Sequence, residues 1–145
     1  MYKHILIPTD GSDLSKKAIK QGVAFAKSLR AKVTAVTVTP TFHTFAAEPL
    51  MVLDTMRDFG KDSAARAKKL LDVARSAAKA AAIRFDGVHA VNDQPYDAII
   101  STARRKGCDL IYMASHGRKG ISALILGSET TKVLTHSKIP VLVCR

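Results

Sequence analysis

Cysteines are few in this sequence of 145 residues, and long apolar runs are absent from it. Crossing a membrane takes roughly 18–20 consecutive apolar residues, and no stretch of the sequence approaches that length. The first residues lead straight into an expected strand, without the three-part pattern of a secretory signal. The two cysteines, Cys108 and Cys144, have neither the spacing nor the neighbouring histidines of a zinc site. We therefore expect a cytoplasmic protein without a membrane segment, in which both cysteines are small, reduced core residues.

Acidic residues are also scarce. The chain has 12 of them against 23 lysines and arginines, which gives a formal net charge of +11. This excess favours polyanionic partners such as nucleotides, nucleic acids or anionic membrane surfaces. The basic residues are spread over every expected helix, however, and the longest basic run is only Arg104-Arg105-Lys106. The sequence has no basic tail, zinc finger or aromatic-and-basic stacking motif, so it favours a solvated basic surface over a nucleic-acid interface.

The pattern of apolar residues predicts five strands that alternate with helices. The strands are expected at residues 2–8, 32–39, 83–91, 109–114 and 139–144, and the helices at 14–29, 51–82, 96–106 and 128–136. The long second helix can also be two collinear pieces hinged at Gly60. Such alternation is typical of a doubly wound parallel sheet with helices on both faces, a Rossmann-like three-layer α/β/α arrangement. The length fits a single domain spanning residues 1–145.

Two segments of the chain are candidates for contacts with partners. The last strand, at 139–144, contains Pro140, which cannot donate to a ladder and so favours an edge position in the sheet. An apolar edge strand can pair with a second copy of itself, so we expect a homodimer through this strand. The other segment is the loop at 41–49, which is long for a compact α/β domain. It is either a lid or partner surface, or a plug in which Phe42 and Phe45 close the end of the core.

A glycine-punctuated loop joins the fourth strand to the last helix. It begins with Ala-Ser-His-Gly at 114–117 and ends with Gly-Ser at 127–128. Strand–loop–helix units of this kind can hold phosphate, because backbone N–H groups and the helix dipole converge on one point. A second turn, Pro-Thr-Asp-Gly-Ser at 8–12, follows the first strand. In a doubly wound sheet both turns lie at the carboxyl ends of strands, where such sheets bind ligands.

Neither turn carries a complete nucleotide-binding signature by itself. No GxGxxG pattern follows the first strand, so a Rossmann dinucleotide site is not expected. The stretch 120–128 lacks the lysine that precedes the final Ser or Thr of a Walker A loop. Together, however, the two turns, the nine residues between Gly117 and Gly127, and the closing Ile-Pro-Val-Leu-Val at 139–143 resemble the universal stress protein family. The resemblance covers the whole chain and implies the adenine nucleotide alpha hydrolase-like fold of that family.

The resemblance also implies a set of nucleotide contacts. The nucleotide-binding branch of the family carries Gly, two residues, Gly, nine residues and Gly-Ser/Thr, and here Ala114 stands at the first glycine. An added methyl matters there only at positive φ or against the ligand, so an extended alanine is tolerable. By resemblance, Asp10 lies near the adenine or ribose, and the backbone of Val38 lies at the adenine edge. The full set expected to contact the nucleotide is Pro8, Thr9, Asp10, Val38, Ala114, His116, Gly117, Arg118, Gly120, Gly127, Ser128 and Glu129.

The sequence leaves three functions open. The leading interpretation is a stress-response or regulatory module that binds ATP or a related adenine nucleotide, with Mg²⁺ accompanying the phosphates. The alternative is a nucleotide-free interaction module of the same fold, which the replacement at Ala114 and the basic surface favour. The third is a hydrolase or phosphotransferase with His116 as its base. Because His116 has no Ser or Asp partner at a recognisable spacing, we do not expect a dedicated enzyme.

Overall fold

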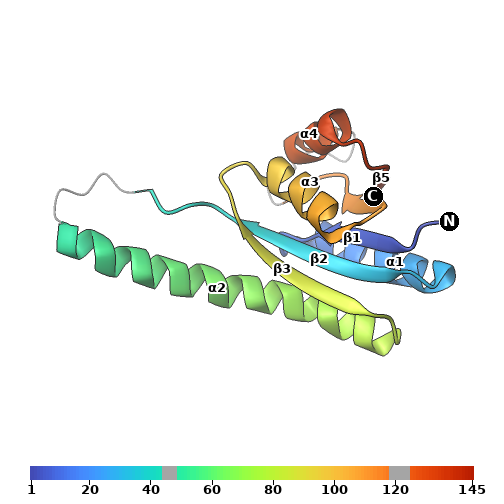
Figure 1. Cartoon of the computed structure of the whole chain (residues 1–145), viewed down its shortest axis with the longest axis horizontal. Helices are drawn as coiled ribbons and strands as arrows, with labels where there is room; N and C mark the ends of the chain where they lie inside the picture. Colours follow the sequence, from blue (N-terminus) through green and yellow to red (C-terminus); the bar gives the residue numbers. More distant parts are fainter. Residues whose placement is uncertain (44–48, 118–124) are drawn as a thin grey trace.

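The structure is a computed structural model that describes residues 1–43, 49–117 and 125–145 (Figure 1). Within these residues, strands and helices alternate along the chain. They are β1 (His4–Pro8), α1 (Asp13–Leu29), β2 (Lys32–Thr39), α2 (Pro49–Ala80), β3 (Phe85–Val91), α3 (Pro95–Lys106), β4 (Leu110–Ala114), α4 (Ser128–His136) and β5 (Val141–Cys144). None of these helices is both long enough and apolar enough to cross a membrane. The element order is the one that the sequence pattern predicts.

The strands form one five-stranded sheet in the order β3-β2-β1-β4-β5, and each pairing of neighbours is parallel. Helices α1 and α2 cover one face of the sheet, and α3 and α4 cover the other (Figure 1). The predicted three-layer, doubly wound fold is therefore confirmed. The strand order reverses between β1 and β4, so the carboxyl ends of these two strands form the switch point of the sheet, where such folds bind ligands.

The apolar run of β1 is buried from both sides. Ile5 and Ile7 belong to the apolar cluster on the α1 side of the sheet, and Leu6 belongs to the cluster on the α3 side. All three are 0% exposed. Alternate residues of a strand point to opposite faces, so a central strand covered by helices on both faces favours a continuous run of apolar side chains such as residues 5–7. This burial fixes the strand whose C-terminal turn reaches the switch point.

Helix α2 is a single helix of 32 residues that continues through Gly60. The hinged two-piece alternative is therefore wrong. The second half of α2 buries Ala67, Leu71, Ala74 and Ala78 against β2 and β3, as expected for an alanine-rich face lying close to a sheet. The first half extends beyond the sheet (Figure 1).

Some element boundaries differ from the sequence prediction. The third strand begins at Phe85 rather than at residue 83, because the chain leaves α2 through Ala82 in the left-handed region, at φ 57°. The last strand begins at Val141, directly after Pro140, rather than at residue 139. Its predicted edge position is correct, since β5 pairs only with β4 among the described strands. Both cysteines are unbridged and buried, and burial raises the pKa of Cys108 to about 11. They are core residues, as predicted.

The described part of the 41–49 loop runs alongside the N-terminal half of α2. The ring of Phe42 lies 5.4 Å from that of Phe59, so Phe42 covers part of the helix that has no sheet beneath it. Phe45 lies outside the described residues. Of the two phenylalanines predicted to plug the end of the core, only Phe42 can be assessed, and it contacts α2 rather than the centre of the core.

Candidate functional site

A cavity of about 520 Å³ lies at the switch point of the sheet. The ends of β1, β2 and β4, the turn before α3 and the start of α4 all contribute to its wall. The lining residues are Pro8, Thr9, Asp10, Ser15, Val36, Val38, Asp93, Pro95, Ile99, Met113, Ala114, His116, Gly117, Gly127, Ser128, Glu129 and Thr130. Its volume falls within the ordinary range of small-molecule sites.

The turn after β1 holds the Asp10 carboxylate at this cavity. Thr9 continues the sheet by donating its N–H to Val36 O at 2.9 Å, and its hydroxyl lies 3.2 Å from Ser15 Oγ. Asp10 Oδ1 accepts the N–H of Ser12 at 3.0 Å, which closes a tight turn through Gly11 at φ 79°. Ser12 then caps α1 by accepting the N–H of Ser15. The carboxylate therefore sits on a rigid turn between a central strand and a capped helix.

The loop after β4 brings the N-terminus of α4 to the same cavity. Gly127 donates its N–H to Ser115 O at 2.7 Å, and Thr130 Oγ1 donates to Ala114 O at 3.0 Å. Gly127 occupies the N-cap position of α4, and it has no side chain that could accept a hydrogen bond from the first turn of the helix. No N-cap side chain therefore competes with a ligand for the first N–H groups of α4. These two contacts anchor the positive end of the helix dipole beside the end of β4.

Glycine is required where this loop passes the turn after β1. A Cβ added to Gly117 would overlap Asp10 Oδ2, and one added to Gly127 would lie 2.9 Å from His116 Cα. Two turns that are more than 100 residues apart in the sequence therefore contact each other through backbone that carries no side chain. This contact explains the glycine at position 117, whereas the glycine at position 127 is explained by its close approach to His116 within the same loop.

The structure brings ten of the twelve predicted contact residues to this one cavity. They are Pro8, Thr9, Asp10, Val38, Ala114, His116, Gly117, Gly127, Ser128 and Glu129. The other two, Arg118 and Gly120, lie outside the described residues, as does Lys119. Their predicted part in neutralising or approaching phosphate stays a prediction.

Comparison with known proteins identifies the family of the chain. The sequence profile of the universal stress protein family matches residues 1–145. The chain belongs to this family. It is 31% identical to universal stress protein MJ0531 of Methanocaldococcus jannaschii over 149 aligned residues, which cover 100% of this chain and 83% of that protein. The resemblance seen in the two turns and the closing strand is therefore a true relationship.

Solved structures agree with this assignment. Hypothetical protein MJ0577 of Methanocaldococcus jannaschii superposes with a TM-score of 0.83 at 28% identity, covering 99% of this chain and 95% of that one. A universal stress protein in complex with cAMP superposes with a TM-score of 0.73 at 25% identity, covering 99% and 97% of the two chains. The universal stress protein fold accounts for the whole described chain.

Ala114 departs from the glycine pattern of the nucleotide-binding branch without strain. It is part of β4, and positive φ occurs among the described non-glycine residues only at Arg30 and Ala82. Its side chain belongs to the apolar cluster on the α1 side, as that of Tyr112 does, although the residue also lines the cavity where β4 ends. Position 114 is extended, so the condition under which an alanine is tolerable there is met.

Asp93 is the main cavity residue that the sequence prediction missed. It follows β3, and its carboxylate accepts the hydroxyl of Thr41 at 2.7 Å, the N–H of Thr41 at 3.0 Å, and a contact from His43 Nε2 at 2.9 Å. The Thr41 hydroxyl, followed by His43, holds the pKa of Asp93 below its usual value. Asp93 thereby fixes the segment after β2 beside the cavity. The turn after β3 lies at the same edge of the sheet as the turns after β1 and β4. This shared position is the feature from which Asp93 could have been predicted as a cavity residue.

Glu129 lines the cavity, but its carboxylate is engaged by protein groups. Oε2 accepts the N–H of Tyr96 at 2.8 Å, and Oε1 lies 3.2 Å from Lys132 Nζ. Helix α3 has Gln94 at its N-cap, with no side-chain cap bond of its own. Glu129 therefore supplies from α4 the acceptor that α3 lacks, which ties the two helices together at the rim of the cavity.

Replacing Glu129 with alanine is expected to lower the free energy of unfolding by about 1 kcal/mol, the usual effect of losing a helix N-cap. Glu129→Gln keeps an oxygen acceptor for Tyr96 N–H and should lose less. Urea unfolding of the two variants measures the difference. Affinity for an anionic ligand in the cavity should not fall, because a nearby negative charge is removed. A Glu129→Ala variant of unchanged stability that binds such a ligand more weakly would contradict the capping role.

Proposed function

We propose that this universal stress protein binds ATP or a related adenine nucleotide in the switch-point cavity, and acts as a stress-response or regulatory module. The observation that carries the proposal is the convergence of two distant segments, the turn at 8–12 and the described loop ends at 114–117 and 127–128, on one cavity of about 520 Å³. Each turn contributes a different chemistry. The first provides a carboxylate and a strand end, and the second provides glycines and a helix N-terminus.

The base and ribose fit the part of the cavity that the ends of β1, β2 and β4 form together with α3. Apolar side chains of Val36, Val38, Ile99 and Met113 line the cavity and offer a surface for the flat face of a purine. Asp10 is held by its turn at the same cavity. A carboxylate acceptor in that position suits the hydroxyl donors of a ribose.

The phosphates fit the start of α4. The N–H groups of the first turn, the Ser128 hydroxyl and the exposed backbone of Gly117 provide donors for anionic oxygens. The net charge of +11 favours the approach of a polyanion. Among the described residues, no group of three His, Cys, Asp or Glu could hold a metal ion. Mg²⁺ would therefore enter with the phosphates rather than occupy a protein cage of its own.

A similar protein supports the choice of nucleotide. The universal stress protein solved in complex with cAMP shares 25% identity and the whole fold with this chain. That complex supports an adenine nucleotide as the ligand here. We propose binding rather than dedicated catalysis, because the hydrogen bond of His116 Nδ1 is to the neighbouring Ser115 hydroxyl, at 3.2 Å. A general base is oriented by an acceptor that raises its basicity, and a serine hydroxyl does this weakly.

Titration calorimetry with ATP, with and without Mg²⁺, tests the proposal. We expect measurable heat and a rise in thermal stability, which amounts to about 2.7 kcal/mol when ATP is at 100 times its Kd. Mass spectrometry of small molecules released from the purified protein should detect an adenine nucleotide. No heat and no thermal stabilisation at millimolar ATP would leave the nucleotide-free interaction module as the better explanation. The three carboxylates that line the cavity, from Asp10, Asp93 and Glu129, are the feature that favours this alternative.

The edge position of β5 supports a further part of the proposal. Val141–Cys144 can pair with the same strand of a second copy, so we propose a homodimer through the C-terminal strand. The cytoplasmic location expected from the reduced cysteines belongs to the same proposal.

A further inference from the structure

Basic residues that are spread along the sequence gather at one edge of the folded sheet. In a parallel sheet all strands begin at the same edge, and each helix that leads into a strand ends there. The end of α2, the start of β3 and the N-terminus lie at this amino edge, on the right of Figure 1. Ten of the 23 lysines and arginines lie there, in the last turns of helices, in the connections into strands or at the first residue of a strand. These ten residues, the basic face, are Lys3, Lys27, Arg30, Lys32, Lys79, Arg84, Arg104, Arg105, Lys106 and Lys138.

Backbone hydrogen bonds fix the segments of the basic face side by side. Lys32 donates its N–H to Lys3 O at 3.0 Å, and Val33 donates its N–H to Arg84 O at 2.9 Å. The entries into β1, β2 and β3 are thereby held together on the rigid sheet. Neighbouring strands lie about 4.8 Å apart, so five strands present an edge about 19 Å wide. The basic face is therefore a broad, fixed surface rather than a flexible tail.

The cations of the basic face are not neutralised by neighbouring acids. Within the part of the chain that the structure describes, Lys106 is the only one of the ten in an ion pair, at 2.6 Å from Asp86. The other acid at this edge, Asp109, accepts the backbone N–H groups of Lys3 and His4. Nine of the ten residues are exposed. These exposed cations are available to an anionic partner.

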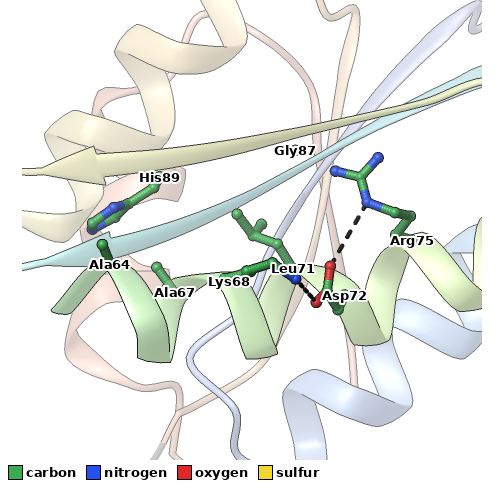
Figure 2. Close-up of a pocket in the computed structure, with 8 residues that line it drawn as sticks. All are labelled: Ala64, Ala67, Lys68, Leu71, Asp72, Arg75, Gly87 and His89. Atoms are coloured by element: carbon green, nitrogen blue, oxygen red, sulfur yellow. Dashed lines mark hydrogen bonds and ion pairs between the residues drawn. The ribbon is translucent and has the colours of Figure 1, made fainter. Parts of the chain in front are cut away.

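The two hollows of the molecule differ from the basic face in this respect. On α2, Asp72 lies between Lys68 and Arg75, 2.6 Å from the first and 3.8 Å from the second (Figure 2). The hollow of about 530 Å³ that they line between α2 and β3 therefore offers an anion no unpaired lysine or arginine among its described residues. The described lining of the nucleotide cavity contains no lysine or arginine, and this cavity lies at the opposite edge of the sheet. The basic face is thus a separate surface.

Helix dipoles explain only part of the basic face. Lys27, Lys79 and the run 104–106 lie in the last turns of helices, where cations complement the negative end of the dipole. The other five residues lie outside the helices. Arg30 is the C-cap of α1 at φ 55°, a left-handed conformation for which glycine is preferred. Capping does not explain an arginine there, so its charge is the feature that remains to be explained.

We propose that the basic face binds the phosphate backbone of duplex nucleic acid without reading its sequence. An edge about 19 Å wide lies against a stretch of duplex DNA that carries about 11 phosphate charges. Contacts of lysine and arginine with phosphate supply essentially all of the affinity in sequence-independent binding. The sequence does not indicate this interface, because five separate segments contribute to it and the longest basic run is only 104–106. The fold brings these segments together.

Two other polyanionic partners fit the basic face less well. Stable binding to a membrane needs inserted apolar groups in addition to cations. Of the large apolar side chains that are exposed among the described residues, only Met1 lies at this edge. Binding of single strands depends on aromatic side chains on which bases stack. The aromatic residues here are Tyr2, which is half-buried, and Phe85, whose ring centre lies 5.0 Å from the guanidinium of Arg75.

Fluorescence anisotropy with a labelled DNA duplex of about 20 base pairs and arbitrary sequence tests the proposal. We expect a Kd of micromolar order at about 50 mM salt. Five phosphate contacts give a slope of about −4.5 for the logarithm of affinity against that of salt, so affinity should fall about 500-fold between about 50 and 200 mM salt. A duplex of another sequence should bind equally well. No binding at 50 mM salt, an affinity independent of salt, or tighter binding to a single strand would overturn the proposal.

Two double variants with the same change in net charge separate the basic face from the charge of the whole chain. Arg84→Glu/Lys138→Glu reverses two exposed cations of the face, and Lys61→Glu/Arg66→Glu reverses two exposed cations of α2 away from it. We expect the first to weaken duplex binding at least tenfold and to reduce the steepness of the salt dependence by about 2. The second should have a clearly smaller effect. Equal weakening by both would show that net charge alone attracts the duplex, which contradicts the proposal.

Two further measurements complete the test. Thermal unfolding checks that both double variants are folded, and their affinity for ATP should match that of the unaltered chain, because the nucleotide cavity lies at the other edge of the sheet. Duplex binding does not depend on the outcome with ATP. Vesicles of phosphatidylserine and phosphatidylcholine test the competing partner. Vesicle binding that Arg84→Glu/Lys138→Glu abolishes, with no binding to the duplex, would assign the basic face to a membrane surface instead.

Discussion

Gly127→Ala should lower the affinity for ATP at least 100-fold, a loss of about 2.7 kcal/mol. The new Cβ would lie 2.9 Å from His116 Cα, 3.1 Å from His116 Cβ and 3.4 Å from Ser115 O. Two of these atoms belong to backbone, which cannot turn aside as a flexible side chain can. The 2.7 Å hydrogen bond from Gly127 N–H to Ser115 O holds the same two segments together. The methyl can be accommodated only if the loop and the start of α4 separate.

Moving the loop away from the start of α4 would destroy the proposed phosphate site but would leave the fold intact. The first N–H groups of α4 would leave the cavity, and the positive end of the helix dipole would move with them. Calorimetry with ATP measures the loss, and thermal unfolding checks that the core persists. Gly60→Ala is a matched control, since its Cβ would have no neighbour within 4 Å and alanine strengthens a helix by about 1 kcal/mol. Unchanged ATP affinity in Gly127→Ala would show that the helix start does not hold phosphate.

The local chemistry of the site was predictable because it depends on short stretches. Helix α4 begins at Ser128 as predicted, since a glycine N-cap and a regular apolar spacing define its start. Asp10 and Gly117 were assigned to one site because both turns follow strands that end at the same edge of a parallel sheet. The structure brings the two turns together as expected, with Gly117 lying against the Asp10 side chain.

Features that depend on tertiary contacts were not predictable. The hydrogen bond of Glu129 to Tyr96 N–H joins residues 33 apart, and nothing near either residue signals it. Asp93, at the cavity, is hydrogen-bonded to Thr41 in the segment after β2, which lies 52 residues earlier in the chain. The late start of β3 follows from the left-handed conformation of Ala82. Alanine rarely adopts this conformation, so the sequence does not predict it. In each case the deciding partner lies on another element.

His4 should make the protein less stable in mild acid. This side chain of β1 is 6% exposed, and its Nε2 lies 2.7 Å from Thr34 Oγ1. Burial lowers the pKa of His4 below 6.5, and Lys32 adds to the effect, while Asp109 and two backbone carbonyls oppose it more weakly. The unfolded chain therefore binds the proton more tightly than the folded chain. The free energy of unfolding should be constant above about pH 6.5 and fall as the pH drops towards the lowered pKa, by at most about 1.4 kcal/mol per pH unit.

Urea unfolding between about pH 7 and pH 4.5 measures this slope, in a window set by the pKa of an unfolded histidine. His4→Gln can keep a hydrogen bond to Thr34 but cannot titrate, so its stability should stay nearly flat there. Asp86 and Asp93 also have lowered pKa values, Asp86 through Lys106 and Asp93 through Thr41, but both titrate below 3.8, outside the window. If His4→Gln loses stability with acid as steeply as the unaltered chain, the proton binds elsewhere, and the burial of His4 in β1 carries no pH dependence.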